Sequence, residues 1–215
     1  MGAIARSIAN NITTSGVFTS SAITNSSVTG ITVLANATDG ITLISSQTAS
    51  NSASISFTSG LTSTYKAYKF VFSNIHARTL NADFQFNLST DAGSNYNVTK
   101  TTTAFQAYNN EAGNDYLLTY NTSYDLAQST AYQNISDTML NDADAQSSGS
   151  MLLFNPASTT YVKHFISDCN GYRGNSFSWR NFVAGYGNTT SAVNAVRFQM
   201  SSGNFDGTIY LYGIK

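Results

Sequence analysis

Apolar and polar residues alternate along much of this chain, and this period of two constrains the fold more than any other sequence feature. The clearest example is Phe84-x-Phe86-x-Leu88, and the same pattern recurs in residues 52–58 and 68–73. Successive side chains of a strand point to opposite faces of a sheet, whereas a helix repeats every 3.6 residues. The alternation therefore predicts half-buried β-strands.

Further strand candidates follow, and clusters of turn-forming residues separate them. The predicted turns include Thr90–Ser94, Asn170-Gly171, Gly185–Asn188 and Ser202–Asn204. The predicted strands run over residues 96–108, 115–120, 150–154, 161–168, 177–183, 195–200 and 207–214. Short strands at this spacing predict an all-β fold, an antiparallel β-sandwich of jelly-roll type spanning residues 41–215.

The amino-acid composition favours a structural or binding protein. Only 10% of the residues are charged, against about 25% in an ordinary soluble domain. Hydroxyl-bearing side chains fit the outer face of a sheet, whereas Glu, Lys and Arg favour helices. A surface of this kind is expected to pack against copies of the same chain or against a larger assembly.

The net charge and hydropathy limit the possible partners. A formal net charge of −1 gives no electrostatic reason for binding nucleic acid. No apolar run approaches the ~20 residues that a membrane-spanning helix needs. We therefore expect neither nucleic-acid binding nor membrane insertion.

Residues 1–40 differ from the rest of the chain. Phe18 is their only aromatic residue, and Arg6 is the only charged residue before Asp39. A stretch of this composition cannot bury enough apolar surface to form its own core. It is interpreted as an extended arm that becomes ordered on a partner, with disorder as the alternative. The expected anchoring residues are Ile4, Ile8, Val17, Phe18, Ile23, Val28 and Ile31.

Two segments in the middle of the chain are harder to interpret. Both faces of Tyr161–Ile166 carry apolar residues, which predicts a central strand that is covered on its outer side as well. Residues 121–149 or a neighbouring subunit are the expected cover. Residues 121–149 themselves are interpreted either as a loop or as the site of a short helical turn.

Acids and bases suited to catalysis are scarce. The two histidines are His76 and His164, and His164 would lie about 13 Å from Asp168 on the same strand face, too far for a hydrogen bond. Asp142 and Asp144 resemble the opening of a calcium loop, but no glycine turn and no terminal glutamate follow. We therefore predict no enzyme activity, no metal site and no cofactor.

Residues 170–180 are the best candidate for recognition because they combine aromatic and guanidinium groups with the only Trp. Such groups suit sugar rings and protein interfaces alike. The alternative is a hairpin loop whose Phe177 and Trp179, two residues apart, both enter the hydrophobic core. The candidate glycan or receptor contacts are Tyr172, Arg173, Trp179 and Arg180.

Several stretches also carry a family resemblance: residues 45–60, 65–70, 83–96, 154–161 and 197–213, together with Met1–Arg6. They resemble small virion structural proteins of tailed phages that infect marine bacteria, including cyanophages. Such proteins are often described as tail-fibre or head-decoration proteins. The resemblance implies a β-sandwich on a phage particle, assembled as a homotrimer and anchored by its N-terminus. It brings no catalytic residues with it.

The leading hypothesis is thus a non-enzymatic virion subunit, assembled in the cytoplasm of a bacterial host. Its arm would dock to a capsid or tail protein, and its sandwich would project outward, with host-surface attachment as a further role. A carbohydrate-binding module for a host surface glycan is the alternative. A polysaccharide depolymerase is disfavoured because no carboxylate pair is recognisable. The sequence leaves head and tail positions equally open.

Overall fold

The computed structural model describes residues 40–174 and 176–215. These residues form twelve β-strands and no helix. No described segment is therefore a helix that could span a membrane. In chain order the strands are β1 (Ile41–Ser52), β2 (Ser54–Phe57), β3 (Ala67–Ala77), β4 (Ala82–Ser89), β5 (Lys100–Asn110), β6 (Tyr116–Tyr120), β7 (Gln133–Met139), β8 (Ser147–Phe154), β9 (Lys163–Arg173), β10 (Phe177–Gly187), β11 (Ala195–Met200) and β12 (Phe205–Ile214).

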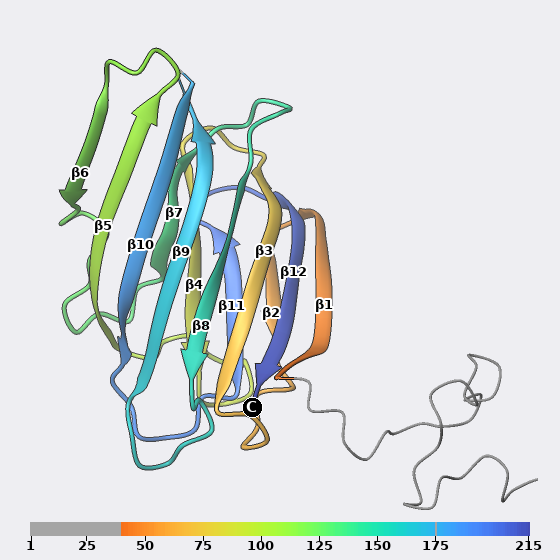
Figure 1. Cartoon of the computed structure of the whole chain (residues 1–215). Helices are drawn as coiled ribbons and strands as arrows, with labels where there is room; N and C mark the ends of the chain where they lie inside the picture. The colour runs from red at the N-terminus through yellow and green to blue at the C-terminus, as the bar shows by residue number, and fades with distance from the viewer. Residues whose placement is uncertain (1–39, 175) are drawn as a thin grey trace, which may run out of the picture. The chain divides into compact units, whose positions relative to one another are not determined.

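The strands form two sheets that pack face to face (Figure 1). The larger sheet has the order β1-β12-β3-β8-β9-β10-β5-β6, and the smaller one has the order β2-β11-β4-β7. All neighbouring strands are antiparallel. The predicted all-β fold and antiparallel sandwich are confirmed.

Four strand pairs are nested in the sequence, so that the first strand pairs with the last and each later pair lies inside the one before. They are β1 with β12, β2 with β11, β3 with β8, and β4 with β7. Two hairpins, β5–β6 and β9–β10, interrupt this series and widen the larger sheet. We refer to β1, β12, β3 and β8 as the core half of the larger sheet. We refer to β9, β10, β5 and β6 as its wing half.

Aromatic side chains fill the space between the core half and the smaller sheet. The ring of Phe198 on β11 lies 5.2 Å from both Phe70 and Phe72 on β3, measured between centroids. It also lies 5.9 Å from Phe84 on β4, and all four rings are buried. The alternation in β3 and β4 places these residues on the inward face, as the period of two predicted.

The inward face of the wing half buries several polar side chains beside apolar ones such as Phe165 and Val183. Lys100 and Thr102 of β5, Lys163 of β9 and Asn181 of β10 are all buried. Strand β7 of the smaller sheet packs against β9 and β10. It supplies polar partners, as when the Thr102 hydroxyl donates to Gln133 Oε1 at 2.7 Å. Hydrogen bonds thus satisfy groups that would otherwise be expensive to bury.

Residues 121–132 complete the backbone hydrogen bonding of β5 beyond the end of β6. They exchange backbone hydrogen bonds with β5 through Asn121, Leu126 and Ser129. This segment therefore closes the part of the β5 edge that β6 does not reach.

Two of the alternatives stated for residues 121–149 are wrong, and a neighbouring subunit as the cover of Tyr161–Ile166 stays a prediction. No helical turn forms there, because Asp137–Met139 lie in β7, where long-range pairing with β4 decides the conformation. The segment also leaves the outer side of Tyr161–Ile166 uncovered, since Ile166 is 51% exposed. Strand β9 is nevertheless central in its sheet, between β8 and β10, as predicted.

Two predicted turns lie inside strands. Gly171 belongs to β9, and Gly185 belongs to β10. A Cβ atom on Gly185 would lie 2.5 Å from the carbonyl oxygen of Thr101 on β5. This glycine thus permits a close approach of two strands rather than a change of direction.

Candidate interaction surface

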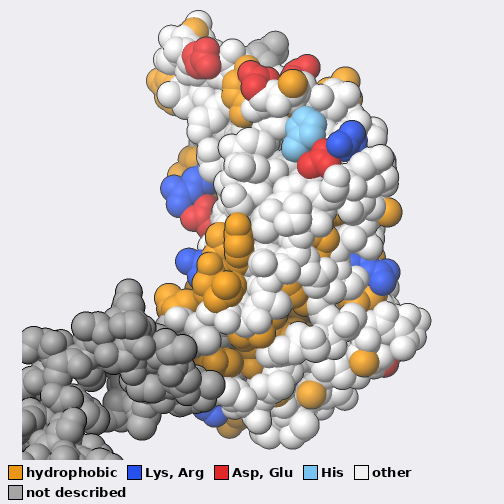
Figure 2. Space-filling view, turned by 90° about the vertical axis from the view of Figure 1, so that its right-hand side faces the viewer, with side chains coloured by type: hydrophobic (Ala, Val, Ile, Leu, Met, Phe, Trp, Pro, Cys, Tyr) orange, Lys and Arg blue, Asp and Glu red, His pale blue; other side chains and the backbone are white. Residues whose placement is uncertain are grey.

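The outer face of the larger sheet is the main candidate for recognition. Among the described residues, no other strand packs on this face. Leu43, Phe105, Leu118 and Ile166 contribute exposed apolar side chains to it. Figure 2, which views the domain from the side of β1, shows hydrophobic side chains gathered on that flank as well, with only a few scattered charges. Extended apolar surface with little charge is typical of interaction sites.

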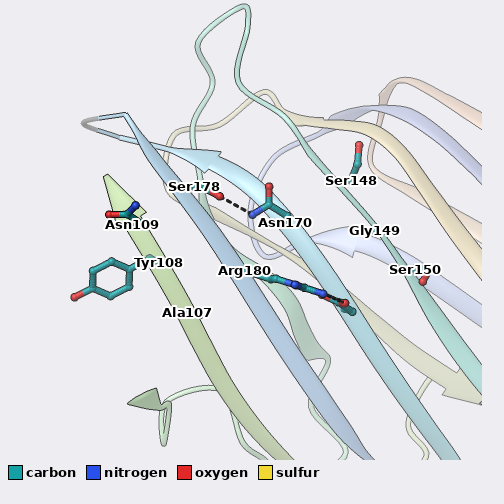
Figure 3. Close-up of a pocket in the computed structure, with 10 residues that line it drawn as sticks. Ala107, Tyr108, Asn109, Ser148, Gly149, Ser150, Asn170, Ser178 and Arg180 are labelled. Carbon is teal, nitrogen blue, oxygen red and sulfur yellow. Dashed lines mark hydrogen bonds and ion pairs between the residues drawn. The ribbon is translucent and has the colours of Figure 1, made fainter. Parts of the chain in front are cut away.

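A shallow trough of about 660 Å³ lies on this face across β8, β9, β10 and β5. Small residues, including Ser148, Ser150 and Ala107, line it. In Figure 3 the side chain of Arg180 reaches from β10 across to β9, and Asn170 points toward Ser178. The trough exists because small side chains on neighbouring strands leave the backbone open to solvent.

Polar contacts between β9 and β10 form one side of the trough. Arg180 Nε and Nη2 donate to the two carboxylate oxygens of Asp168 at 2.8 and 2.5 Å. Asn170 Nδ2 donates to the Ser178 hydroxyl at 3.0 Å. Because the two charges neutralise each other, this surface offers hydroxyl, amide and paired ionic groups without net charge.

The four predicted contact residues lie on two different faces. Tyr172 and Arg180 are on the outer face, whereas Arg173 and Trp179 are on the inward face. The guanidinium carbon of Arg173 lies 4.0 Å from the centre of the Trp179 ring. Tyr108 of β5 stacks on the same indole at 4.1 Å. The structure therefore does not bring the four residues together as one site.

The buried carboxylate of Asp137 and the half-buried carboxylate of Asp83 lie close to this inward stack. Asp137 pairs with Arg173 at 3.3 Å and accepts a hydrogen bond from Asn181 Nδ2 at 2.9 Å. Asp83 accepts the backbone N–H of Thr138 at 2.8 Å, and burial raises the pKa of its carboxyl group. The hollow beside Asp137 measures about 10 Å³, about the size of one water molecule. Asp137 thus holds β7 against the wing half, Asp83 joins β4 to β7, and the hollow leaves no room for a substrate.

Two buried lysines were missed by sequence reasoning. Lys100 Nζ donates to Asn87 Oδ1 at 2.6 Å and to the Val98 carbonyl at 2.9 Å. Burial lowers the pKa of Lys100 to about 7 and also lowers that of Lys163, which donates to two backbone carbonyls. Neither ammonium forms an ion pair with a described acidic residue. Only the strand register reveals that both residues face inward.

The two histidines and the cysteine, the other side chains that could take part in catalysis, either make structural contacts or have no catalytic partner nearby among the described residues. His76 Nδ1 lies 2.7 Å from the Ala145 carbonyl oxygen. His164 is exposed on the outer face, and Asp168 on the same face pairs with an arginine. Burial raises the pKa of the Cys169 thiol to about 12. Within the described ranges, no group of three or more His, Cys, Asp or Glu side chains could hold a metal ion.

The expected anchoring residues fall outside the described part of the chain, so their role stays a prediction. They are Ile4, Ile8, Val17, Phe18, Ile23, Val28 and Ile31.

Comparison with known proteins adds no relative. No family model, no curated protein and no solved structure matches this chain.

Proposed function

We propose that this chain is a non-enzymatic structural subunit of a phage particle, either a head-decoration protein or a tail-fibre protein. In this proposal residues 1–40 dock to a capsid or tail protein, and the sandwich of residues 41–215 projects outward. The subunits assemble as a homotrimer in the cytoplasm of the bacterial host. The sequence resemblance and the sparsely charged surface both support this role.

The strand pairing carries the proposal. A single long hairpin that is rolled into two sheets gives nested strand pairs. The pairs here are β1 with β12, β2 with β11, β3 with β8 and β4 with β7. An eight-stranded domain split between two sheets in this way is a jelly roll, an architecture used by viral capsid proteins and lectins. Hairpins β5–β6 and β9–β10 are then insertions that widen one sheet.

The chemistry of the described residues supports a role without catalysis. The carboxylates of Asp83, which is half-buried, and Asp137, which is buried, have structural partners, and the hollow beside Asp137 admits no substrate. Split carboxylate pKa values and an accessible site are both needed for general acid–base hydrolysis. A scaffold needs neither.

Incorporation into particles tests the anchoring role. A chain lacking residues 2–40 should fold with an unchanged circular dichroism spectrum in the β region and should be absent from purified particles. A full-length variant with Ser at the seven anchoring positions keeps the length of the arm and should also be lost. Incorporation of both variants at the wild-type level would refute the anchoring role.

A carbohydrate-binding module is the second candidate, and the trough on the outer face favours it. Its uncharged hydroxyl and amide groups lie near Tyr172, and planar polar groups beside an aromatic ring suit a neutral sugar. Glycan-array screening of the full chain tests this role. Tyr172→Ala should abolish the signal, whereas Trp179→Phe, a change on the inward face, should preserve it. No binding at millimolar glycan would exclude the role.

A further inference from the structure

Strand β6 forms one free edge of the larger sheet, as the left-hand side of Figure 1 shows. It spans Tyr116–Tyr120, with the sequence Tyr-Leu-Leu-Thr-Tyr. Its apolar side chains are exposed on both faces: Tyr116 is 71% exposed, Leu118 69%, Leu117 49% and Tyr120 49%. Burial in the fold therefore does not account for this composition.

Natural edge strands usually carry features that prevent pairing with another chain. Charged residues, proline and β-bulges are the common ones. Residues 116–120 contain none of the first two, and the pairing of β6 with β5 is free of register shifts. The opposite edge strand, β1, has two register shifts, between Leu43 and Ser45 and between Ala49 and Ser52. Of these two edges, β6 is the one left open to another strand.

The hydrogen-bond alternation of the hairpin shows which backbone groups are free. Asn110 N–H donates to the Asp115 carbonyl, and Asn121 N–H donates to the Ala104 carbonyl. Positions 115, 117, 119 and 121 therefore direct their N–H and C=O groups toward β5. Positions 116, 118 and 120 direct theirs toward the open edge. The Thr119 hydroxyl donates to the Tyr120 carbonyl at 3.2 Å, which leaves the second lone pair of that oxygen for a partner.

The sequence of β6 is almost symmetric about its centre, Leu118. Tyr116 and Tyr120 occupy equivalent places on either side of it, and Leu117 is matched by Thr119. An antiparallel strand of the same sequence would therefore meet it with aromatic opposite aromatic and leucine opposite leucine. No like charges would face each other, and cross-strand aromatic pairs are favourable. This symmetry favours a second copy over an unrelated partner.

We infer that β6 pairs with β6 of a second copy of this chain, antiparallel about a twofold axis through Leu118. The two Leu118 residues then face each other, and each Tyr116 faces Tyr120 of the other copy. Every free N–H and C=O group at positions 116, 118 and 120 gains a partner, which makes six backbone hydrogen bonds. The outer faces coincide, so Ala107 and Leu118 of both copies form one continuous apolar row across the two sheets.

Disulfide trapping tests both the contact and its register. Directly opposed residues in a hydrogen-bonded antiparallel pair have Cα atoms about 5.5 Å apart, within the range that a disulfide bridges. Leu118→Cys should therefore give a covalent dimer under mild oxidation, at least about tenfold faster than Tyr116→Cys. Tyr116 is the matched control because it is equally exposed but would lie opposite Tyr120, far from its own counterpart. The native Cys169 is buried and should not react.

Light scattering of the uncross-linked full chain gives an independent readout. Leu118→Lys should halve the molar mass of the assembly, because the twofold contact is lost. Tyr161→Lys, at an exposed residue outside β6, should leave the molar mass unchanged. Equal cross-linking of both cysteine variants, no cross-linking of either, or an unchanged mass for Leu118→Lys would overturn the inference. None of these readouts depends on the virion role or on the threefold assembly that the resemblance implies.

Discussion

The core half and the wing half of the larger sheet bury their inward faces by different means. In the core half, phenylalanine rings on β3 interlock with rings on β4 and β11 of the smaller sheet, as around Phe198. In the wing half, the buried positions include Lys100, Thr102, Lys163 and Asn181. The wing half also buries Phe165, Cys169 and Val183 on this face, and it carries further apolar side chains on its exposed outer face and along β6.

This difference indicates that the two halves contribute differently to the stability of the fold and to the positioning of its strands. Apolar burial is non-directional and supplies most of the free energy of folding. Buried hydrogen bonds add less net free energy, but they require one particular arrangement of their partners. The core half therefore accounts for most of the stability, and the wing half gains a defined position on the sandwich. Its outer face and its edge strand β6 stay exposed among the described residues.

The largest expected contrast is between an aromatic ring of the smaller sheet that packs on the core half and an aromatic ring of the wing half. Phe198→Ala should lower the free energy of unfolding by about 3–5 kcal/mol, because it leaves a cavity among several rings. Phe182→Ala removes a partly exposed wing-half ring that stacks on Phe105 at 4.7 Å, and it should cost about 1 kcal/mol. Urea unfolding measures both. Losses of equal size would contradict the assignment of stability to the core half.

Two ion pairs of the wing half provide the next comparison. Arg173→Met removes the partner of the buried Asp137 carboxylate and should lower the free energy of unfolding by about 2 kcal/mol. Arg180→Met removes the pair with Asp168 on the outer face, where water screens both charges. Its effect on urea unfolding should be the smaller of the two. The reverse order would mean that the inward ion pair does not position β7.

Lys100 makes stability depend on pH where β5 meets the smaller sheet. Its pKa is about 7 in the folded chain, against 10.5 for an unperturbed lysine. Between these values the unfolded chain binds more protons, so the free energy of unfolding rises with pH. We expect a gain of roughly 1–2 kcal/mol between pH 7 and 9, measured by urea unfolding.

Lys100→Met should flatten most of this slope, and the lowered pKa of Lys163 acts in the same direction. The raised pKa of Cys169 opposes the trend from about pH 8 upward, as the unfolded thiol begins to ionise. An identical slope in the wild type and in Lys100→Met would show that Lys100 is not the titrating group.

The smallest expected effect concerns the exposed apolar residues of β6. Leu118→Ser should change the free energy of unfolding by no more than about 0.5 kcal/mol at submicromolar chain concentration. Leu211→Ser, in the buried face of β12, should cost several times more. Thermal unfolding compares the two. A large loss for Leu118→Ser would show that β6 contributes to the fold itself.

The period of two was a reliable guide wherever one strand face is purely apolar. Strand β11 coincides with the predicted residues 195–200, and the cores of β3 and β4 were also recognised. Strand β7 was missed because its inward positions include the polar residues Gln133 and Asp137. Their partners come from the wing half, far away in the sequence. A local pattern cannot reveal a polar residue that is buried by a distant strand.

The candidate recognition residues were only partly predictable, for the same reason. Residues 170–180 do lie in the wing half, but Tyr172 and Arg173 are neighbours in one strand and so face opposite sides of the sheet. The signal for this separation was the period of two itself. It could have been used only if Gly171 had been read as part of a strand rather than as a turn. The trough combines residues of four strands that are far apart in the sequence, so no single stretch of the sequence predicts it.

The sequence by itself determined the strand character, the all-β class and the nearly uncharged surface, because alternation and composition are local properties of the chain. Only the tertiary structure decided which strands pair, which polar groups are buried and which edge stays open. Register and coverage depend on contacts between distant segments, and a shift of one residue would reverse every face. The exposure of β6 and the burial of Lys100 are therefore consequences of pairing that the alternation alone does not contain.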